Sequence, residues 1–227
     1  MRAITKPNAV EAFKRIIDIA PVYGDIKLDE SGYMYLEVET LCVHITDPLR
    51  DLDKLVDWSP LGKQAMDYYR DQLVYGAHIK KENPEDEAEY TYYQRLREYG
   101  VPASEVAGYM LEIDQIKEII SKLKEFELSR RAVAVTWQPW VDLESNDPPC
   151  LDLLKFTIKD NKLCLSVVFR SHDLIKGWCN NVYALVHLMS YMADLLGVDV
   201  GYLEVISFDP HVYMSDVDRV KMLKEKI

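Results

Sequence analysis

The sequence has few cysteines, and their arrangement predicts neither a metal centre nor a disulfide framework. The four cysteines form no CxxC pair and lie near no histidine cluster: Cys42, Cys150, Cys164 and Cys179. Two of them, Cys42 and Cys164, lie within apolar runs typical of strands, where a thiol packs as a small apolar group. We therefore expect neither zinc nor structural disulfides, and a reducing compartment.

The sequence also lacks an excess of positive charge and any long apolar run. With 27 Lys and Arg against 38 Asp and Glu, the formal net charge is −11. This charge argues against a general nucleic-acid or membrane-surface binder, so an anionic ligand would need a local basic pocket. No run reaches transmembrane length, and the first residues, MRAITKPNAVEAFKR, contain no signal-peptide core. We therefore expect a cytoplasmic protein.

Repeats, low-complexity segments and interdomain linkers are also missing. The 227 residues, 48% of them hydrophobic, are enough to fill one core. Helical spacings mixed with long apolar strands predict a single α+β domain, 1–227.

The expected elements follow from apolar spacing and from local start and stop signals. We expect helices at 8–20, 59–75, 114–124, 181–196 and 215–225, and strands at 33–45, 130–138, 151–158, 162–170 and 201–208. Asn8 is a suitable N-cap residue for the first helix. The helix at 181–196 is apolar nearly all round, which predicts burial at the centre of the fold. The charge-rich segment 80–89 predicts a solvated surface loop.

Residues able to carry chemistry are concentrated between Ser129 and Tyr213. In chain order they are Ser129-Arg130-Arg131, Trp137, Pro148-Pro149-Cys150, Arg170-Ser171-His172-Asp173, Gly177, Asn180-Asn181 and His211-Val212-Tyr213. They lie at the ends of predicted elements, where a pocket would be built.

This order of motifs resembles the flavin-independent thymidylate synthase family. The motifs SRR, W, PC, RSxD, G, N and HxY match in order over roughly Tyr92 to Tyr213, and Ile113-Asp114-Gln115-Ile116 also resembles the family upstream. The compact form with SRRAVAV, PCL and FRSxD is most similar to the methanogen-type archaeal branch. The resemblance implies a thymidylate synthase-like fold, in which a mixed sheet and helices surround a long buried central helix.

Cys150 is the candidate nucleophile. It follows two prolines and begins a predicted strand, so its thiol is held rigidly. A nearby guanidinium lowers the pKa of a thiol and supplies thiolate. In the family, the matching thiolate adds to C6 of a pyrimidine, and C5 then takes a one-carbon unit from a methylene-pterin. The implied co-substrate is 5,10-methylene-tetrahydrofolate or methylene-tetrahydromethanopterin, with no metal.

The resemblance assigns further roles. Arg170 and Ser171 match phosphate ligands, with Arg170 also close enough to activate the cysteine. Arg130 and Arg131 match a pair that reaches the same phosphate from the partner subunit, which implies a homodimer with shared sites; guanidinium groups suit a dianionic phosphate. The remaining matches are Asp173 for the base, His211 and Tyr213 for the sugar 3′-hydroxyl, and Tyr92 as an active-site tyrosine.

Asn181 matches the residue that reads the base. A carboxamide offers a donor and an acceptor, so it can pair with O4 and N3–H of uracil. Cytosine presents the reverse pattern, and the related hydroxymethylases resemble this family with Asp at that position. Asn181 therefore predicts a uracil nucleotide, and we rank Asn180 as a neighbour.

Four features depart from the family pattern. Leu151 follows the cysteine where many members have His, the first half has no large insert, and the tail lacks the apolar closing segment. The early acid–base glutamate has no clear counterpart among the candidates Glu37, Glu39, Asp67 and Asp71.

The leading interpretation is a thymidylate synthase, a methyltransferase that makes dTMP from dUMP. Two alternatives remain: a pyrimidine nucleotide 5-hydroxymethylase on the same fold, and a nucleotide-binding protein without catalysis. The sequence leaves open the carbon donor, the sugar, and whether the product carries methyl or hydroxymethyl.

Overall fold

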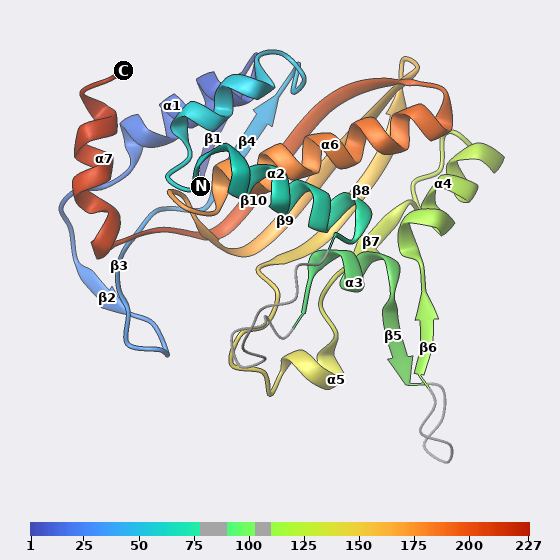
Figure 1. Ribbon diagram of the computed structural model, residues 1–227, viewed down its shortest axis with the longest axis horizontal. Coiled ribbons are helices and arrows are strands. Elements are labelled where there is room, and N and C mark those ends of the chain that lie inside the picture. Colours follow the sequence, from blue (N-terminus) through green and yellow to red (C-terminus); the bar gives the residue numbers. More distant parts are fainter. Residues whose placement is uncertain (78–89, 103–109) are drawn as a thin grey trace.

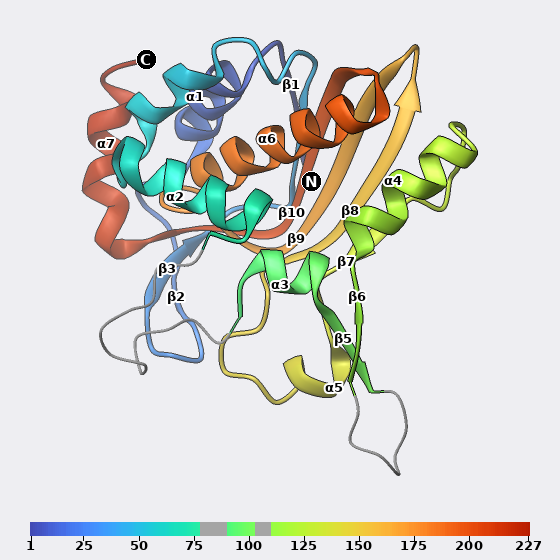
Figure 2. The ribbon, with the colours of Figure 1, turned by 45° about the vertical axis from the view of Figure 1, so that its right-hand side comes forward.

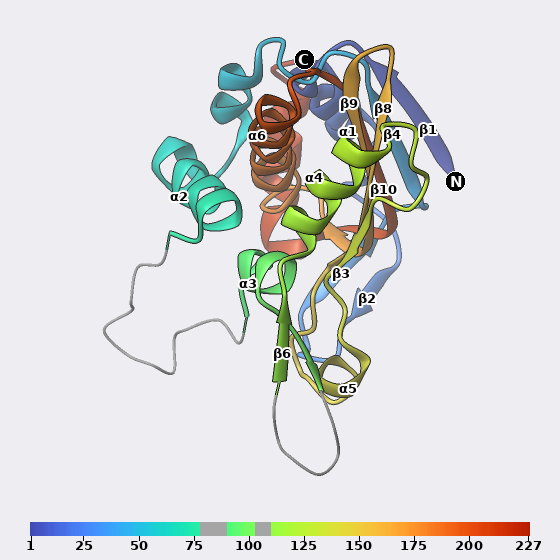
Figure 3. The ribbon, with the colours of Figure 1, turned by 90° about the vertical axis from the view of Figure 1, so that its right-hand side faces the viewer.

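A mixed β-sheet forms the centre of the protein, and helices cover one of its faces (Figures 1 and 3). The computed structural model describes residues 1–77, 90–102 and 110–227. The main sheet has the order β1 (Arg2–Lys6), β4 (Leu41–Ile45), β10 (Asp199–Tyr213), β9 (Lys162–Asp173), β8 (Leu151–Lys159) and β7 (Val133–Val135). The hairpin of β2 (Ile26–Leu28) and β3 (Met34–Glu37) joins it through β10, and β5 (Tyr99–Pro102) pairs with β6 (Met110–Ile113) separately.

The sheet is mixed because two of its pairings are parallel, β1 with β4 and β10 with β9, and the others are antiparallel. The α-helices are α1 (Ala9–Ile19), α2 (Gly62–Tyr75), α3 (Tyr92–Arg97), α4 (Gln115–Glu125), α5 (Pro139–Asp142), α6 (Trp178–Leu196) and α7 (Val217–Lys224). The described residues also form the 3₁₀ helices η1 (Leu52–Trp58) and η3 (Met214–Asp216). The predicted α+β class is confirmed.

Helix α6 is the predicted buried central helix. It packs on β9 and β10, and α2 lies against its other side (Figure 2). Trp178 at its start is fully buried and stacks on Phe13 of α1, with ring centroids 5.6 Å apart. Within the described residues, no helix combines the length and apolar character needed to span a bilayer.

Local signals explain where several helices begin and end. The side chain of Asn8 accepts a hydrogen bond from the Glu11 amide at 2.8 Å, which confirms the predicted N-cap of α1. Helix α2 ends at Gly76, whose φ of 72° favours glycine. A Cβ on Gly76 would lie 2.8 Å from the ring of Tyr93, so Tyr93 packs closely only because this residue is glycine.

The predicted single strand at 33–45 is wrong. It is divided into β3 and β4, which pair with two different parts of β10. Between these parts lies Pro210, which has no N–H to donate to a sheet. The Val38 amide donates to the carbonyl of Pro210 at 2.9 Å, and β3 and β4 keep the same register on β10, so only the regular pairing is interrupted between the two strands.

Two other boundaries differ from expectation. The strand expected at 130–138 is only Val133–Val135, because Pro139 already begins α5. The helix expected from residue 59 begins at Gly62, since the Ser59 hydroxyl accepts a hydrogen bond from the Leu61 amide in the preceding turn.

The strands predicted at 151–158, 162–170 and 201–208 are confirmed, and each is longer than expected. The extension of β10 to Tyr213 brings the His-x-Tyr motif into the sheet. The segment predicted as a surface loop, 80–89, lies outside the described residues.

Candidate active site

Cys150 and Arg170 lie together where β8 begins and β9 ends. The Arg170 amide donates to the Cys150 carbonyl at 2.9 Å, and Nη2 of Arg170 lies 3.9 Å from Sγ of Cys150. The same guanidinium donates to the carbonyls of Pro149 at 2.9 Å and Pro148 at 2.8 Å. The two prolines therefore orient the guanidinium against the thiol.

The thiol of Cys150 does not have the lowered pKa that the sequence predicted. Arg170 acts to lower it, but burial acts more strongly and raises the pKa above its usual value. The nearby charges of Asp147, Asp152 and Asp173 raise it further. Desolvation of a thiolate is a tertiary effect that motif spacing did not include.

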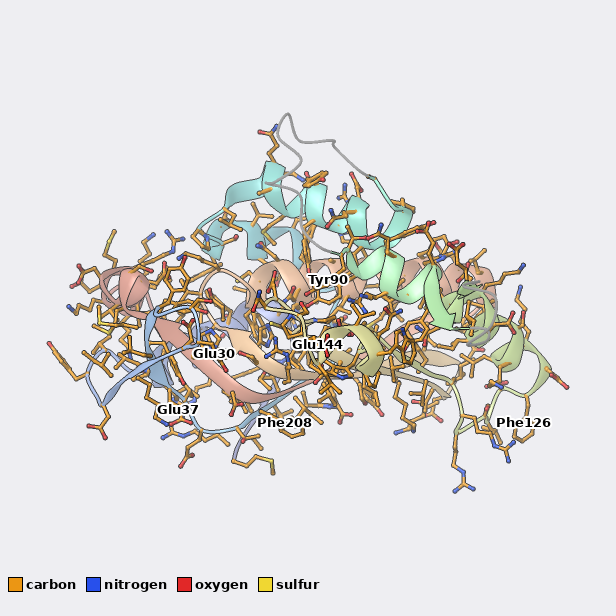
Figure 4. All side chains as sticks on the ribbon, turned by 90° about the horizontal axis from the view of Figure 1, so that it is seen from below. Glu30, Glu37, Tyr90, Phe126, Glu144 and Phe208 are labelled. Carbon is orange, nitrogen blue, oxygen red and sulfur yellow. The ribbon has the colours of Figure 1, made fainter. Side chains whose placement is uncertain are left out.

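Three tyrosines lie within electrostatic range of the thiol. The hydroxyl of Tyr92, at the start of α3, accepts a hydrogen bond from the Leu151 amide at 3.1 Å. The ring of Tyr90 lies 5.7 Å from that of Tyr92, and in the view from below Tyr90 lies near the centre of the molecule (Figure 4). Burial raises the pKa of Tyr69, Tyr90 and Tyr92, and Cys150 contributes to each shift. All three therefore remain neutral hydroxyls near the thiol.

Asn181 is held by two side chains. Its Oδ1 accepts a hydrogen bond from the Tyr69 hydroxyl at 2.6 Å, and its Nδ2 lies 3.1 Å from Nε2 of His172. The other ring nitrogen of His172 lies 2.8 Å from Oγ of Ser207. Burial lowers the pKa of His172 to about 3, so its ring is neutral. The neighbouring Asn180 binds the Ser59 hydroxyl and the Lys176 carbonyl instead.

Asp173 closes the turn between β9 and α6. Its carboxylate accepts hydrogen bonds from the amides of Ile175 at 2.8 Å and Lys176 at 3.0 Å. A Cβ on Gly177 would lie 2.9 Å from the Asp173 carbonyl, so this close approach requires glycine. Ser171 lies two residues earlier on β9, in register with Asp209 of β10.

His211 and Tyr213 lie on one face of β10, as their spacing predicted. Their ring centroids are 4.8 Å apart, and the Tyr213 hydroxyl lies 3.5 Å from a carboxylate oxygen of Asp29. Burial, followed by the charges of Asp29, Asp173 and Cys150, raises the pKa of Tyr213 to about 12. The structure thus brings Tyr213 within electrostatic range of the thiol.

A pocket of about 460 Å³ adjoins Tyr213. It is lined by the β2–β3 hairpin, the turn before α6, the end of β10 and the start of η3, with the residues Gly32, Tyr33, Met34, Lys176, Tyr213, Met214 and Ser215. Its volume is in the range of small-molecule sites.

Arg130 and Arg131 are predicted site residues that the chain does not bring to Cys150. Both are exposed just before β7, at the edge of the main sheet. Within the described part of the chain, neither side chain forms a hydrogen bond or ion pair.

Sequence reasoning missed two residues at this site. Tyr69 carries no motif, and only the packing of α2 on α6 brings it to Asn181. Asp152 occupies a register shift in β8, and its Oδ1 is buried without a partner among the described residues. Burial raises the pKa of Asp152 to about 6, with Arg170 opposing the shift. The sequence feature that could have identified Asp152 is its position two residues after Cys150.

The four carboxylates considered as counterparts of the family glutamate lie in ion pairs elsewhere. Glu37 pairs with Lys27, Glu39 with Arg2, Asp67 with Lys63 and Arg70, and Asp71 with Arg70. The described residues also contain no cluster of three His, Cys, Asp or Glu side chains suited to a metal ion.

Comparison with known proteins gives one consistent result. The family model described as thymidylate synthase matches residues 53–226. A protein of Methanosarcina acetivorans named "Putative thymidylate synthase" is 36% identical over 226 residues, covering 100% of this chain and 96% of the relative. A protein of Methanocaldococcus jannaschii with the same name is 34% identical over 227 residues, covering 97% of this chain and 95% of the relative.

Proposed function

Because the chain belongs to the thymidylate synthase family, we propose that it methylates C5 of dUMP to give dTMP. Membership implies a methyltransferase that uses a methylene-folate-type co-substrate. The observation that carries the proposal is the position of the Cys150 thiol beside the Arg170 guanidinium. The thiol also lies within electrostatic range of Tyr69, whose hydroxyl binds the Asn181 carboxamide. This arrangement suits a nucleophile, an anion ligand and a base-reading group.

The reaction begins with the Cys150 sulfur. As it bonds to C6 of uracil, the C5=C6 π electrons move toward O4, where the Asn181 Nδ2–H group can donate to the developing oxyanion. Because burial raises the pKa of the thiol, its proton needs an acceptor. We assign this role to Asp152, whose carboxyl pKa of about 6 permits it to be ionised at neutral pH.

The pocket beside Tyr213 is our proposed site for the pterin. Tyrosine and methionine side chains suit a flat heteroaromatic ring, and Lys176 suits an acidic tail. When bound, the reduced pterin supplies the carbon and the electrons that bring it to methyl. Incubating purified protein with dUMP and each candidate pterin, then identifying the C5 substituent by mass, tests the function. A hydroxymethyl product would establish the alternative enzyme.

The phosphate site is proposed to be completed by a second copy of the chain. The face of the sheet opposite the helices exposes Val133, Val135 and Phe208, the last on the side away from α2 in Figure 4. Arg130 and Arg131 lie beside this face, exposed and unpaired among the described residues. A second copy packed there would bury the apolar side chains and bring its arginines to Arg170 and Ser171 of this chain.

Mixing two inactive variants should therefore restore activity. Cys150→Ser leaves its own arginines intact, and Arg130→Ala leaves its own thiol intact, so a mixed dimer contains one complete site. We expect about a quarter of wild-type kcat after subunit exchange of equal amounts, if the variants mix at random. Mixing Cys150→Ser with Cys150→Ala is the matched control and should restore nothing. No recovery after demonstrated exchange, or a monomer in sedimentation, would refute shared sites.

Asn181 should determine the choice of base. We expect the wild type to process dUMP at least about tenfold better than dCMP in kcat/KM, since an unpaired buried polar group costs about 1–3 kcal/mol. Asn181→Asp should lose this preference while its affinity for either nucleotide changes less, because the phosphate ligands are unchanged. Asn180→Asp alters the neighbouring amide, which binds Ser59, and should retain the preference. A wild-type preference for dCMP would favour the hydroxymethylase.

A further inference from the structure

The hydrogen-bond chain at Asn181 determines which way its carboxamide faces, and we infer that Tyr69 locks it in the orientation that reads uracil. The inference rests on the proposed function and adds a specificity-determining residue that does not touch the nucleotide. Tyr69 would act through Asn181, as a positioning residue.

The chain consists of four side chains from separate elements. Tyr69 of α2 donates to Oδ1 of Asn181 on α6 at 2.6 Å, and Nδ2 of Asn181 lies 3.1 Å from Nε2 of His172 on β9. Nδ1 of His172 lies 2.8 Å from Oγ of Ser207 on β10. Each polar atom of the carboxamide thus has one internal partner, which leaves one lone pair on Oδ1 and one hydrogen on Nδ2 for a ligand.

His172 and Ser207 accept either orientation of the amide. The neutral ring carries one N–H, on either nitrogen. With the proton on Nδ1, the ring donates to Ser207 and accepts from Nδ2 of Asn181. With the proton on Nε2, the ring would donate to Oδ1 of a flipped amide while Ser207 donates to Nδ1. Every hydrogen bond between Asn181, His172 and Ser207 is retained in both states. His172 and Ser207 therefore do not favour either orientation of the carboxamide.

Tyr69 does select one orientation. Its hydroxyl is protonated, and its only hydrogen-bond partner among the described residues is Oδ1 of Asn181. In the flipped state Nδ2 would face the hydroxyl, whose proton would then have no acceptor. A desolvated donor without an acceptor is costly, so the phenol keeps Oδ1 directed toward itself.

This orientation matches uracil and opposes cytosine. The remaining lone pair of Oδ1 can accept from N3–H, and the remaining hydrogen of Nδ2 can donate to O4. Cytosine has an acceptor at N3 and a donor at N4, so it would need the flipped amide that Tyr69 disfavours. Removing one hydroxyl should therefore relax base selection without touching the nucleotide.

The test compares the binding of dUMP and dCMP by isothermal titration calorimetry, without a pterin and without turnover. In Tyr69→Phe we expect the ratio of the two dissociation constants to move toward cytosine by about tenfold, mostly through tighter binding of dCMP. Tyr75→Phe removes an exposed hydroxyl from the same helix and should leave the ratio unchanged.

Each outcome is decisive. A wild type that prefers dUMP, with the same preference in Tyr69→Phe, overturns the lock and leaves the proposed function standing. A wild type that binds neither nucleotide overturns both. If thermal unfolding shows that Tyr69→Phe does not fold, Tyr69→Met provides the same test. An unchanged ratio of the dUMP and dCMP dissociation constants in Tyr69→Met would overturn the lock.

Discussion

Replacing Cys150 by serine should lower kcat by at least about 10³-fold, as expected when the nucleophile of a covalent mechanism is removed. Serine retains the shape of the side chain but is a much weaker nucleophile toward C6. The phosphate and base ligands remain, so the dissociation constant of dUMP should change only a few-fold. Steady-state kinetics and calorimetry of the same preparation separate these two effects.

Cys42→Ser is the matched control, because Cys42 is also a partly exposed free thiol but lies on β4, away from the candidate site. It should retain nearly full activity. A Cys150→Ser protein with more than about a tenth of wild-type kcat would contradict covalent catalysis at this residue.

Removing the Asp142 carboxylate should destabilise the protein by about 3–5 kcal/mol, because it leaves a buried guanidinium unpaired. Arg95 binds both oxygens of Asp142, at 2.7 and 3.1 Å, with side-chain exposures of only 9% and 0%. Arg95 also donates to Gln138 at 2.6 Å. For Asp142→Ala, the melting temperature should fall by about 6–20 °C in thermal denaturation.

The exposed pair of Asp218 and Lys221 provides the control. Asp218→Ala removes an ion pair of similar length from the surface, where screening leaves little stabilisation, so the melting temperature should hardly change. Asp142→Ala should also impair catalysis, because Arg95 lies on α3 with Tyr92 and anchors that helix to α5. Equal decreases in melting temperature for Asp142→Ala and Asp218→Ala would contradict a larger contribution of the buried pair to stability.

Local sequence signals predicted the elements whose boundaries depend on local chemistry. The start of α1 follows from the Asn8 side chain. The predicted strands β8 and β9 are joined by Asp160 and Asn161, whose φ of 51° and 59° suit a two-residue hairpin turn. The break between β3 and β4 was not predictable in this way. It depends on Pro210, in a strand distant in sequence with which both strands pair.

At the candidate site, too, the features set by motif order were predictable from the sequence, and those set by tertiary packing were not. Motif order placed Cys150 and Arg170 together, and the structure confirms their contact. The pKa of the thiol was predicted wrongly because burial depends on the whole fold. Tyr69 was missed because nothing near it in sequence indicates that α2 will place its hydroxyl against Asn181.

A covalent bond between Cys150 and C6 of the pyrimidine is the central claim, and trapping with 5-fluoro-dUMP tests it most directly. Fluorine at C5 cannot leave as a proton does, so the adduct formed with a methylene-pterin should persist. After trypsin digestion, mass spectrometry should find nucleotide and pterin together on peptide 132–155, whose only cysteine is Cys150. An adduct on Cys42, Cys164 or Cys179, or none with either pterin, would contradict the account.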